Sequence, residues 1–189
     1  MSLLITGILM FTLVHLFPAA MKSSRDALAN RLGPGPYQGL FAAVILGSIV
    51  VIVFGWKMAV PSLSYKPVLP AGLVTSGLML IAFVLFVASV LPTNVKRLIR
   101  HPQMTGTLIW SVTHLLSNGD SRSIALFGGL GLWSILEIVL CNRRDGEWQK
   151  PEAVAMKQDA ICVIVGTGLF AATAYFHRWL FGVTVIPGL

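Results

Sequence analysis

The chain has 189 residues, of which 56% are hydrophobic and only 11% are charged, and its mean hydropathy is +0.81. A soluble globular domain has about 25% charged residues, so this composition excludes that class and predicts a polytopic membrane protein. The net charge of +7 comes without a basic helix, a zinc spacing or a stacking pattern, so we exclude nucleic acid as a partner. The two cysteines have no motif spacing and predict neither a disulfide framework nor a cysteine metal site.

Apolar runs of about 20 residues, long enough to cross a bilayer, recur along the chain. They are Leu3–Met21, Tyr37–Val60, Ala71–Leu91, Ser123–Cys141 and Asp159–Phe181. A shorter run, Met104–Ser117, rises only about 21 Å against a hydrocarbon core of about 30 Å, so it would need a polar extension or shielding by its neighbours. The first run lacks a basic segment and a small-residue cleavage site before Lys22, and we expect a retained helix there, not a signal peptide. The sequence thus predicts an all-α membrane helical bundle of about six transmembrane helices with a short fourth helix, in a single domain over residues 1–189.

Lysine and arginine are distributed unequally between the connecting loops. The first, third and fifth loops hold Lys22, Arg25, Arg31, Lys96, Arg97, Arg100, Arg143, Arg144, Lys150 and Lys157, and the opposite side holds Lys57, Lys66, Arg122 and Arg178. The positive-inside rule therefore predicts cytoplasmic odd-numbered loops with both termini outside. We expect a multi-pass protein of a bacterial inner (plasma) membrane, with membrane lipids as partners. The oligomeric state is left open.

Two histidines lie inside apolar runs and are the first candidates for chemistry. His114 has Trp110 on the same helical face at i−4, and His15 has Phe11 in the same relation. An imidazole in lipid needs a partner, a cavity or a metal. Two intramembrane histidines on different helices are what bis-histidine haem coordination requires. The alternative, equally open on pattern alone, is that each one hydrogen-bonds a neighbouring helix or lines a water-filled cavity.

A second candidate site is basic and precedes the short fourth helix. His101 follows Arg100 and precedes Pro102, which predicts a helix start at the membrane interface. His101 lies about 20 Å from His114 along a straight helix, so these two would not share a metal. Arg100 and His101 could instead bind an anionic head group or a cofactor phosphate. The simpler interpretation is a basic cytoplasmic loop.

Glu137 is the only acidic residue well inside a predicted span. An intramembrane carboxylate is by default a functional candidate. Glu137 also lies about two turns from Arg143 and Arg144, so a structural ion pair near the interface is the alternative.

Three segments carry a resemblance to a known family: HLFPAAMKSSRDALANRLGPGPYQGLF, RHPQMTGTLIWSVTHLLSNGD and NRRDGEWQKPE. They resemble the NnrU family and, through it, zeta-carotene isomerase, from the first helix to about Glu152. The resemblance implies a membrane-bound haem b with His15 and His114 as metal ligands. It also implies a redox-linked function, either isomerisation of a lipophilic polyene or a role in nitrate, nitrite and nitric oxide metabolism (denitrification). The isomerase has a cysteine where this chain has Ser111, and because a neutral hydroxyl is a poor iron ligand, ligand switching by that route is not implied here.

Two other functions stay open, and whether the chain is an enzyme stays open with them. It could be a non-enzymatic accessory protein of the same metabolism, with both histidines structural. RHPxxxG is also similar to the start of a motif in isoprenylcysteine methyltransferases and sterol reductases. That resemblance implies that Arg100, His101 and Glu137 hold S-adenosylmethionine or a nicotinamide nucleotide.

Overall fold

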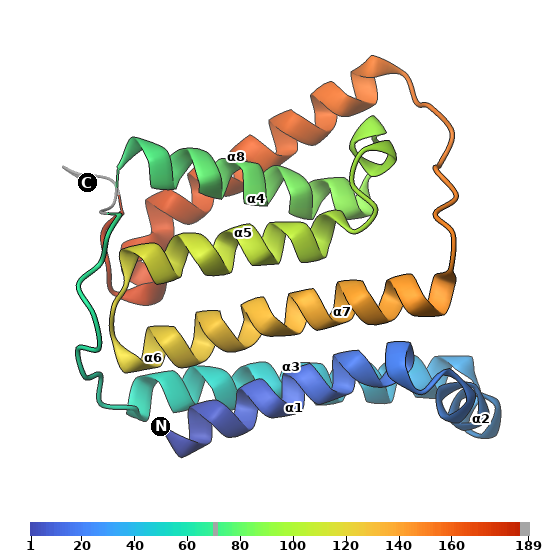
Figure 1. The fold of residues 1–189 in the computed structure, drawn as a ribbon, viewed down its shortest axis with the longest axis horizontal. Coiled ribbons are helices and arrows are strands. Elements are labelled where there is room, and N and C mark those ends of the chain that lie inside the picture. Colours follow the sequence, from blue (N-terminus) through green and yellow to red (C-terminus); the bar gives the residue numbers. More distant parts are fainter. Residues whose placement is uncertain (70–71, 186–189) are drawn as a thin grey trace. The chain divides into compact units, whose positions relative to one another are not determined.

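The computed structural model describes residues 1–69 and 72–185, and helices make up most of them (Figure 1). Within these ranges the only strand-like pairing is an isolated antiparallel bridge between Leu63 and Asp120, so the all-α prediction is confirmed. The elements in chain order are α1 (Ser2–Ala20), α2 (Lys22–Leu32), α3 (Pro34–Met58), α4 (Leu73–Val90), the 3₁₀ helix η1 (Asn94–Arg97), α5 (Pro102–Ser117), α6 (Ser121–Ser123), the π-helical turn η2 (Ile124–Gly128), α7 (Gly129–Asp145) and α8 (Met156–Phe181).

Five helical segments in the described part of the chain are long and apolar enough to cross a membrane. They are α1, α3, α4, the continuous run α6–η2–α7 and α8. Each corresponds to one of the long apolar runs, although Ala71, the predicted start of the third, lies outside the described residues. The predicted sixth span is not confirmed, because α5 has 16 residues and is shorter than the roughly 20 that a span needs. The orientation of the loops and termini stays a prediction.

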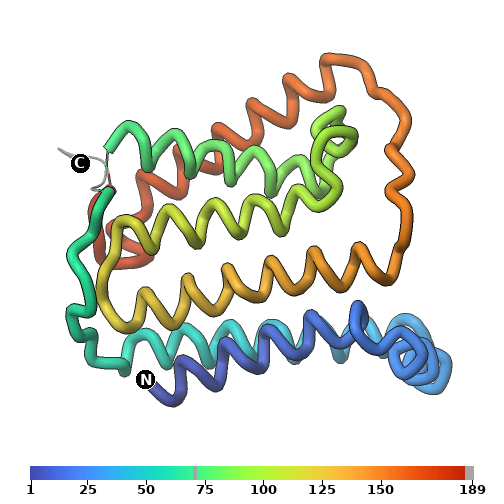
Figure 2. Tube along the Cα trace, in the orientation of Figure 1, coloured from blue at the N-terminus to red at the C-terminus, as the bar shows by residue number. Residues whose placement is uncertain are grey.

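The first connecting loop contains a helix that the sequence did not predict. α1 ends at Met21, whose backbone (φ −127°, ψ 57°) leaves the helical region, and α2 begins directly after it (Figure 2). Pro18, in the last turn of α1, has no N–H to donate to the helix. α3 then begins after Gly33, whose φ of +87° suits glycine, with Pro34 in the first helical position. The basic residues of this loop therefore lie on a short helix of their own.

One compact unit comprises residues 1–65 and 119–147. In it α1 packs against α3 and against α7. Small residues allow this approach: a Cβ atom added to Gly7 would lie 2.7 Å from the Ile52 backbone nitrogen, and one added to Gly129 would lie 2.8 Å from the Ile8 side chain. Association of membrane helices through small residues follows from the absence of a hydrophobic driving force in lipid.

The second unit comprises residues 66–118 and 148–189, and its described part places α4 against α5 and α8. Val87, Ala88 and Cys162 form a buried cluster between α4 and α8. A Cβ atom added to Gly166 would lie 2.8 Å from Val84 Cα, so α8 also approaches α4 through a glycine. The organisation of residues 1–189 as a single domain stays a prediction.

A polar cluster fastens η1 to the start of α8 in this second unit. Asn94 Nδ2 donates hydrogen bonds to the Val154 carbonyl (2.9 Å) and to Asp159 Oδ2 (2.6 Å), and Asn94 Oδ1 accepts one from the Val154 N–H (3.0 Å). The Thr93 hydroxyl donates to Asp159 Oδ1, which also accepts from the Asn94 N–H at 2.8 Å. These bonds hold the α8 end of the polar loop that joins α7 to α8.

Candidate functional site

His15 lies in α1 of the first unit, and one of its ring nitrogens makes a hydrogen bond within that helix. Its Nδ1 lies 2.9 Å from the Phe11 carbonyl oxygen, one turn earlier. Because a carbonyl can only accept, Nδ1 carries the proton, and Nε2 of the neutral ring presents a lone pair. Metal-binding histidines usually donate their other N–H to a carbonyl or carboxylate in this way. His15 therefore has the tautomer that a metal ligand needs.

Three aromatic rings from three helices surround the His15 imidazole, and we call them the aromatic cage: Phe11 of α1, Phe41 of α3 and Trp133 of α7. Their ring centroids lie 4.1, 5.7 and 4.9 Å from that of His15. Phe11 and Trp133 also meet edge to face at 5.0 Å, which closes one side of the cage. Such contacts restrict the rotation of the imidazole and keep water away from it.

Trp133 is the most buried member of the aromatic cage, with 4% of its surface exposed. Its indole N–H has no hydrogen-bond partner among the described residues. The sequence alone did not mark this tryptophan as a candidate. Its place on an apolar helix was visible in the sequence, but its approach to His15 depends on how α1 and α7 pack.

His114 lies near the end of α5 in the second unit and repeats the local geometry of His15. Its Nδ1 lies 2.8 Å from the Trp110 carbonyl oxygen, and the Trp110 ring centroid is 5.1 Å from that of the imidazole. Nδ1 therefore carries the proton here too. The His114 carbonyl accepts from both the backbone N–H and the side-chain amide of Asn118, the residue that follows the end of α5.

Ser111 and Thr113 are buried polar residues of α5, close in sequence to His114. They are 1% and 3% exposed, and neither hydroxyl oxygen finds a hydrogen-bond partner in the part of the chain that the structure describes. Buried hydroxyls are nearly always satisfied in native proteins. Ser111 thus combines deep burial with an unsatisfied hydroxyl oxygen.

The basic candidate site lies at the amino-terminal end of α5. His101 is the residue that precedes the helix, Pro102 occupies its first position, and the Thr105 N–H and hydroxyl both donate to the His101 carbonyl at 3.0 Å. The predicted helix start is confirmed. Binding of a phosphate or head group by Arg100 and His101 stays a prediction.

Glu137 lies on α7 in the unit that also contains His15. Its Oε1 is 3.5 Å from the Cys141 sulfur, one turn later. Arg144 directs its guanidinium to the neighbouring Asp145, with Nε at 2.7 Å from Oδ1. The pairing of Glu137 with Arg143 or Arg144 stays a prediction.

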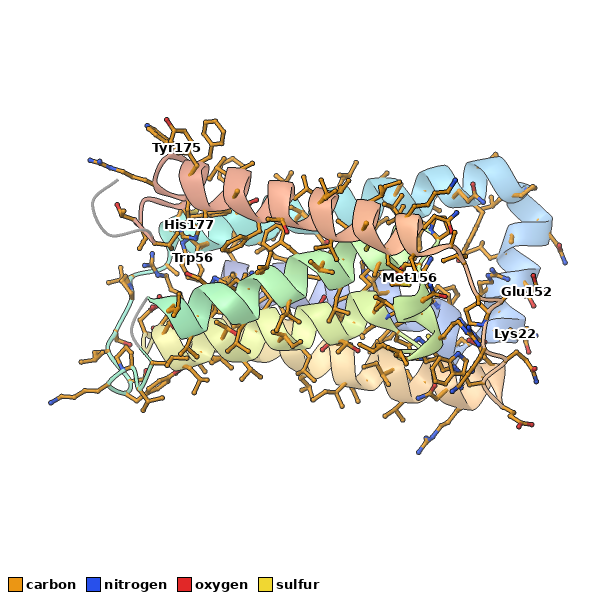
Figure 3. All side chains as sticks on the ribbon, turned by 90° about the horizontal axis from the view of Figure 1, so that it is seen from above. Lys22, Trp56, Glu152, Met156, Tyr175 and His177 are labelled. Atoms are coloured by element: carbon orange, nitrogen blue, oxygen red, sulfur yellow. The ribbon has the colours of Figure 1, made fainter. Side chains whose placement is uncertain are left out.

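The candidate residues divide between the two units. His15 and Glu137 belong to the first, and Arg100, His101 and His114 belong to the second. His177, labelled in Figure 3, lies in α8 of the second unit, where its Nδ1 donates to the Val183 carbonyl at 2.7 Å. Within residues 1–69 and 72–185, no group of three or more histidine, cysteine or acidic side chains is arranged to hold a metal ion.

The fold defines an all-α membrane protein with five helical segments, among the described residues, that are long and apolar enough to cross a bilayer. A family model described as NnrU protein matches residues 3–185, which is nearly the whole chain. The chain belongs to the NnrU family. No curated protein and no solved structure matches it.

Proposed function

We propose that the chain is an integral membrane haem b protein in which His15 and His114 are the axial ligands. The observation that carries this proposal is the bond that each histidine makes from Nδ1–H to the carbonyl one turn earlier, which holds the ring against its own helix and leaves Nε2 as the nitrogen that can bind iron. The pairing of the two histidines on one haem comes from the family resemblance. Bound haem supplies one-electron redox chemistry.

The residues of the chain contribute orientation and exclusion of water. The aromatic cage holds the His15 ring from three helices, and Trp110 lies against the His114 ring. An imidazole fixed in this way loses little freedom when it binds a ligand. The apolar rings also keep competing water away from Nε2.

The redox-linked function has two candidate forms within this proposal. The resemblance to the isomerase makes a lipophilic polyene the candidate substrate, which would reach the site from the bilayer. The family resemblance alternatively supports a role beside the enzymes of nitrate, nitrite and nitric oxide metabolism.

An absorption spectrum of protein purified in mild detergent, after expression with haem supply, tests the proposal first. The wild type is expected to carry about one haem per chain, with a Soret band and sharp α and β bands after reduction by dithionite. His15→Ala and His114→Ala should each abolish these bands. His177→Ala is the matched control, since it also removes an imidazole that donates Nδ1–H to a carbonyl. Haem retained in both single variants would overturn the ligand assignment, and a haem-free wild type would overturn the proposal.

A second candidate function, binding of S-adenosylmethionine or a nicotinamide nucleotide, is favoured by the position of Arg100 and His101 directly before α5. The amino-terminal end of a helix favours anions, and here two potentially cationic side chains stand beside it. Arg100→Ala separates the two functions. It should leave the haem spectrum unchanged and abolish nucleotide binding measured by calorimetry in detergent. Absence of nucleotide binding by the wild type would remove this candidate and leave a non-enzymatic accessory role as the alternative to haem.

A further inference from the structure

The unpaired indole N–H of Trp133 is an unusual feature of the aromatic cage. Tryptophan can only donate, and buried donors in native proteins nearly always have a partner. Trp133 is 4% exposed, and its Nε1 has none among the described residues. The N–H therefore points to an acceptor that binds from outside the chain.

The residues around Trp133 do not supply that acceptor. Phe11 and Phe41 carry no polar side-chain atom. The His15 ring meets the indole edge to face, at an interplanar angle of 61° and a centroid distance of 4.9 Å, and the two rings form no hydrogen bond in the structure. The aromatic cage thus contains an indole donor without a partner beside an imidazole whose Nδ1 is hydrogen-bonded to the Phe11 carbonyl.

The chemistry of haem b narrows the choice of acceptor. The edge of this cofactor carries methyl, vinyl and propionate groups, and among these only the propionate carboxylates accept strong hydrogen bonds. A carboxylate that accepts from a buried N–H forms a charge-assisted bond, which is stronger than a bond between neutral groups. A bare carboxylate in an apolar surrounding would be costly.

We propose that Trp133 Nε1–H donates a hydrogen bond to a propionate of the haem whose iron His15 binds. This inference rests on the proposed function. The proposal makes Trp133 a haem-binding residue. The aromatic cage would then both orient His15 and bind the propionate-bearing edge of the cofactor.

Trp133→Phe tests the proposal, because it keeps an aromatic ring beside His15 and removes the N–H. The propionate would then keep more of its negative charge and stabilise ferric iron, so the midpoint potential should fall below that of the wild type. Loss of a hydrogen bond to a charged group should also make haem dissociation roughly ten times faster or more. Haem content and reduced spectrum should be retained when haem is in excess.

Trp56→Phe is the matched control. Trp56, labelled in Figure 3, lies in α3 of the same unit next to Gly55, which contacts Leu4 at the start of α1. His15 is eleven residues further along α1, or about 16 Å at 1.5 Å per residue. Trp56→Phe should therefore change neither the potential nor the dissociation rate.

Ultraviolet resonance Raman spectroscopy reports whether an indole N–H is hydrogen-bonded, and it can be applied to the haem-free and the haem-loaded protein. This measurement does not depend on whether the Trp133→Phe variant folds. The Trp110→Phe background removes the tryptophan next to His114. One tryptophan should change from a free to a hydrogen-bonded N–H on loading. An N–H already bonded in the haem-free protein, as a bridging water would make it, would overturn the proposal. So would a Trp133→Phe variant with the wild-type potential. A haem-free wild type would instead contradict the proposed function.

Discussion

Replacing Gly166 by alanine should weaken the packing of α8 against α4. A Cβ atom at this position would lie 2.8 Å from Val84 Cα and 2.9 Å from Val84 Cγ2, whereas ordinary van der Waals contact begins at 3.4 Å. The nearest atom is backbone and cannot turn away. The two helices would therefore have to separate locally by about 0.6 Å, the difference between 2.8 and 3.4 Å.

The loss of stability caused by Gly166→Ala follows from the size of this displacement. A gap of about 0.5–1 Å removes roughly a quarter to a half of the dispersion attraction between the atoms that face each other. Overpacking of this kind typically costs about 1–3 kcal/mol. Alanine recovers part of the loss, because it is better than glycine in a helix interior by about 0.8–1 kcal/mol. We therefore expect Gly166→Ala to be destabilised by up to about 2 kcal/mol, with a central value of about 1 kcal/mol.

Gly168, two residues along the same helix, is the matched control. A Cβ atom there meets no atom within 4 Å among the described residues. Gly168→Ala should thus gain only the helix propensity and become more stable by about 0.5–1 kcal/mol. Titration with sodium dodecyl sulfate in mild detergent, followed by far-ultraviolet circular dichroism, measures both free energies of unfolding. If the two variants changed stability in the same direction, the close approach of α8 to Val84 would be wrong.

Two further predictions concern polar side chains at helix ends. Burial raises the pKa of Asp120, but hydrogen bonds from Ser123 and from the Arg122 N–H together outweigh this effect and hold the pKa below the ordinary value of an aspartate. The stabilisation by Asp120 is therefore complete at neutral pH and lost as the pH falls through this lowered pKa, so Asp120→Asn should flatten the acid side of the unfolding temperature plotted against pH. An unchanged acid slope would contradict this role. Asn94→Ala removes two hydrogen bonds to Val154, and a glutamate-specific endoproteinase should then cleave the loop between α7 and α8 faster, after Glu147 or Glu152. The exposed Asn30→Ala is its control, and equal cleavage rates would show that the polar cluster does not restrain this loop.

The long helices could be predicted because lipid leaves the backbone few alternatives. In a bilayer every N–H and carbonyl must be paired within the chain, so an apolar run of span length becomes a helix. Pro102 likewise predicted the start of α5, and the apolar run that stops at Ser117 predicted its end. α2 was missed because its sequence, KSSRDALANRL, is polar and was assigned to a loop.

The contacts between helices could not be predicted in the same way. Asn94 and Asp159 are 65 residues apart, and nothing in either local sequence indicates the other. Trp133 is compatible with a membrane interface, a helix contact or a binding site, because an indole suits all three. Only the packing of α1, α3 and α7 distinguishes them.

The tautomer of a histidine does not by itself identify a ligand, and His177 shows why. His15, His114 and His177 all donate Nδ1–H to a backbone carbonyl and so all present Nε2. His177 makes this bond to Val183, six residues later and beyond the end of α8, which turns its ring toward the helix end. The rings of His15 and His114 are held against their own helices, one turn back, and His15 is also enclosed by the aromatic cage. The combination of this tautomer with fixed surroundings makes His15 a better candidate for an iron ligand than His177. Retention of haem by His177→Ala would agree with this, because His177 has the tautomer without the fixed surroundings.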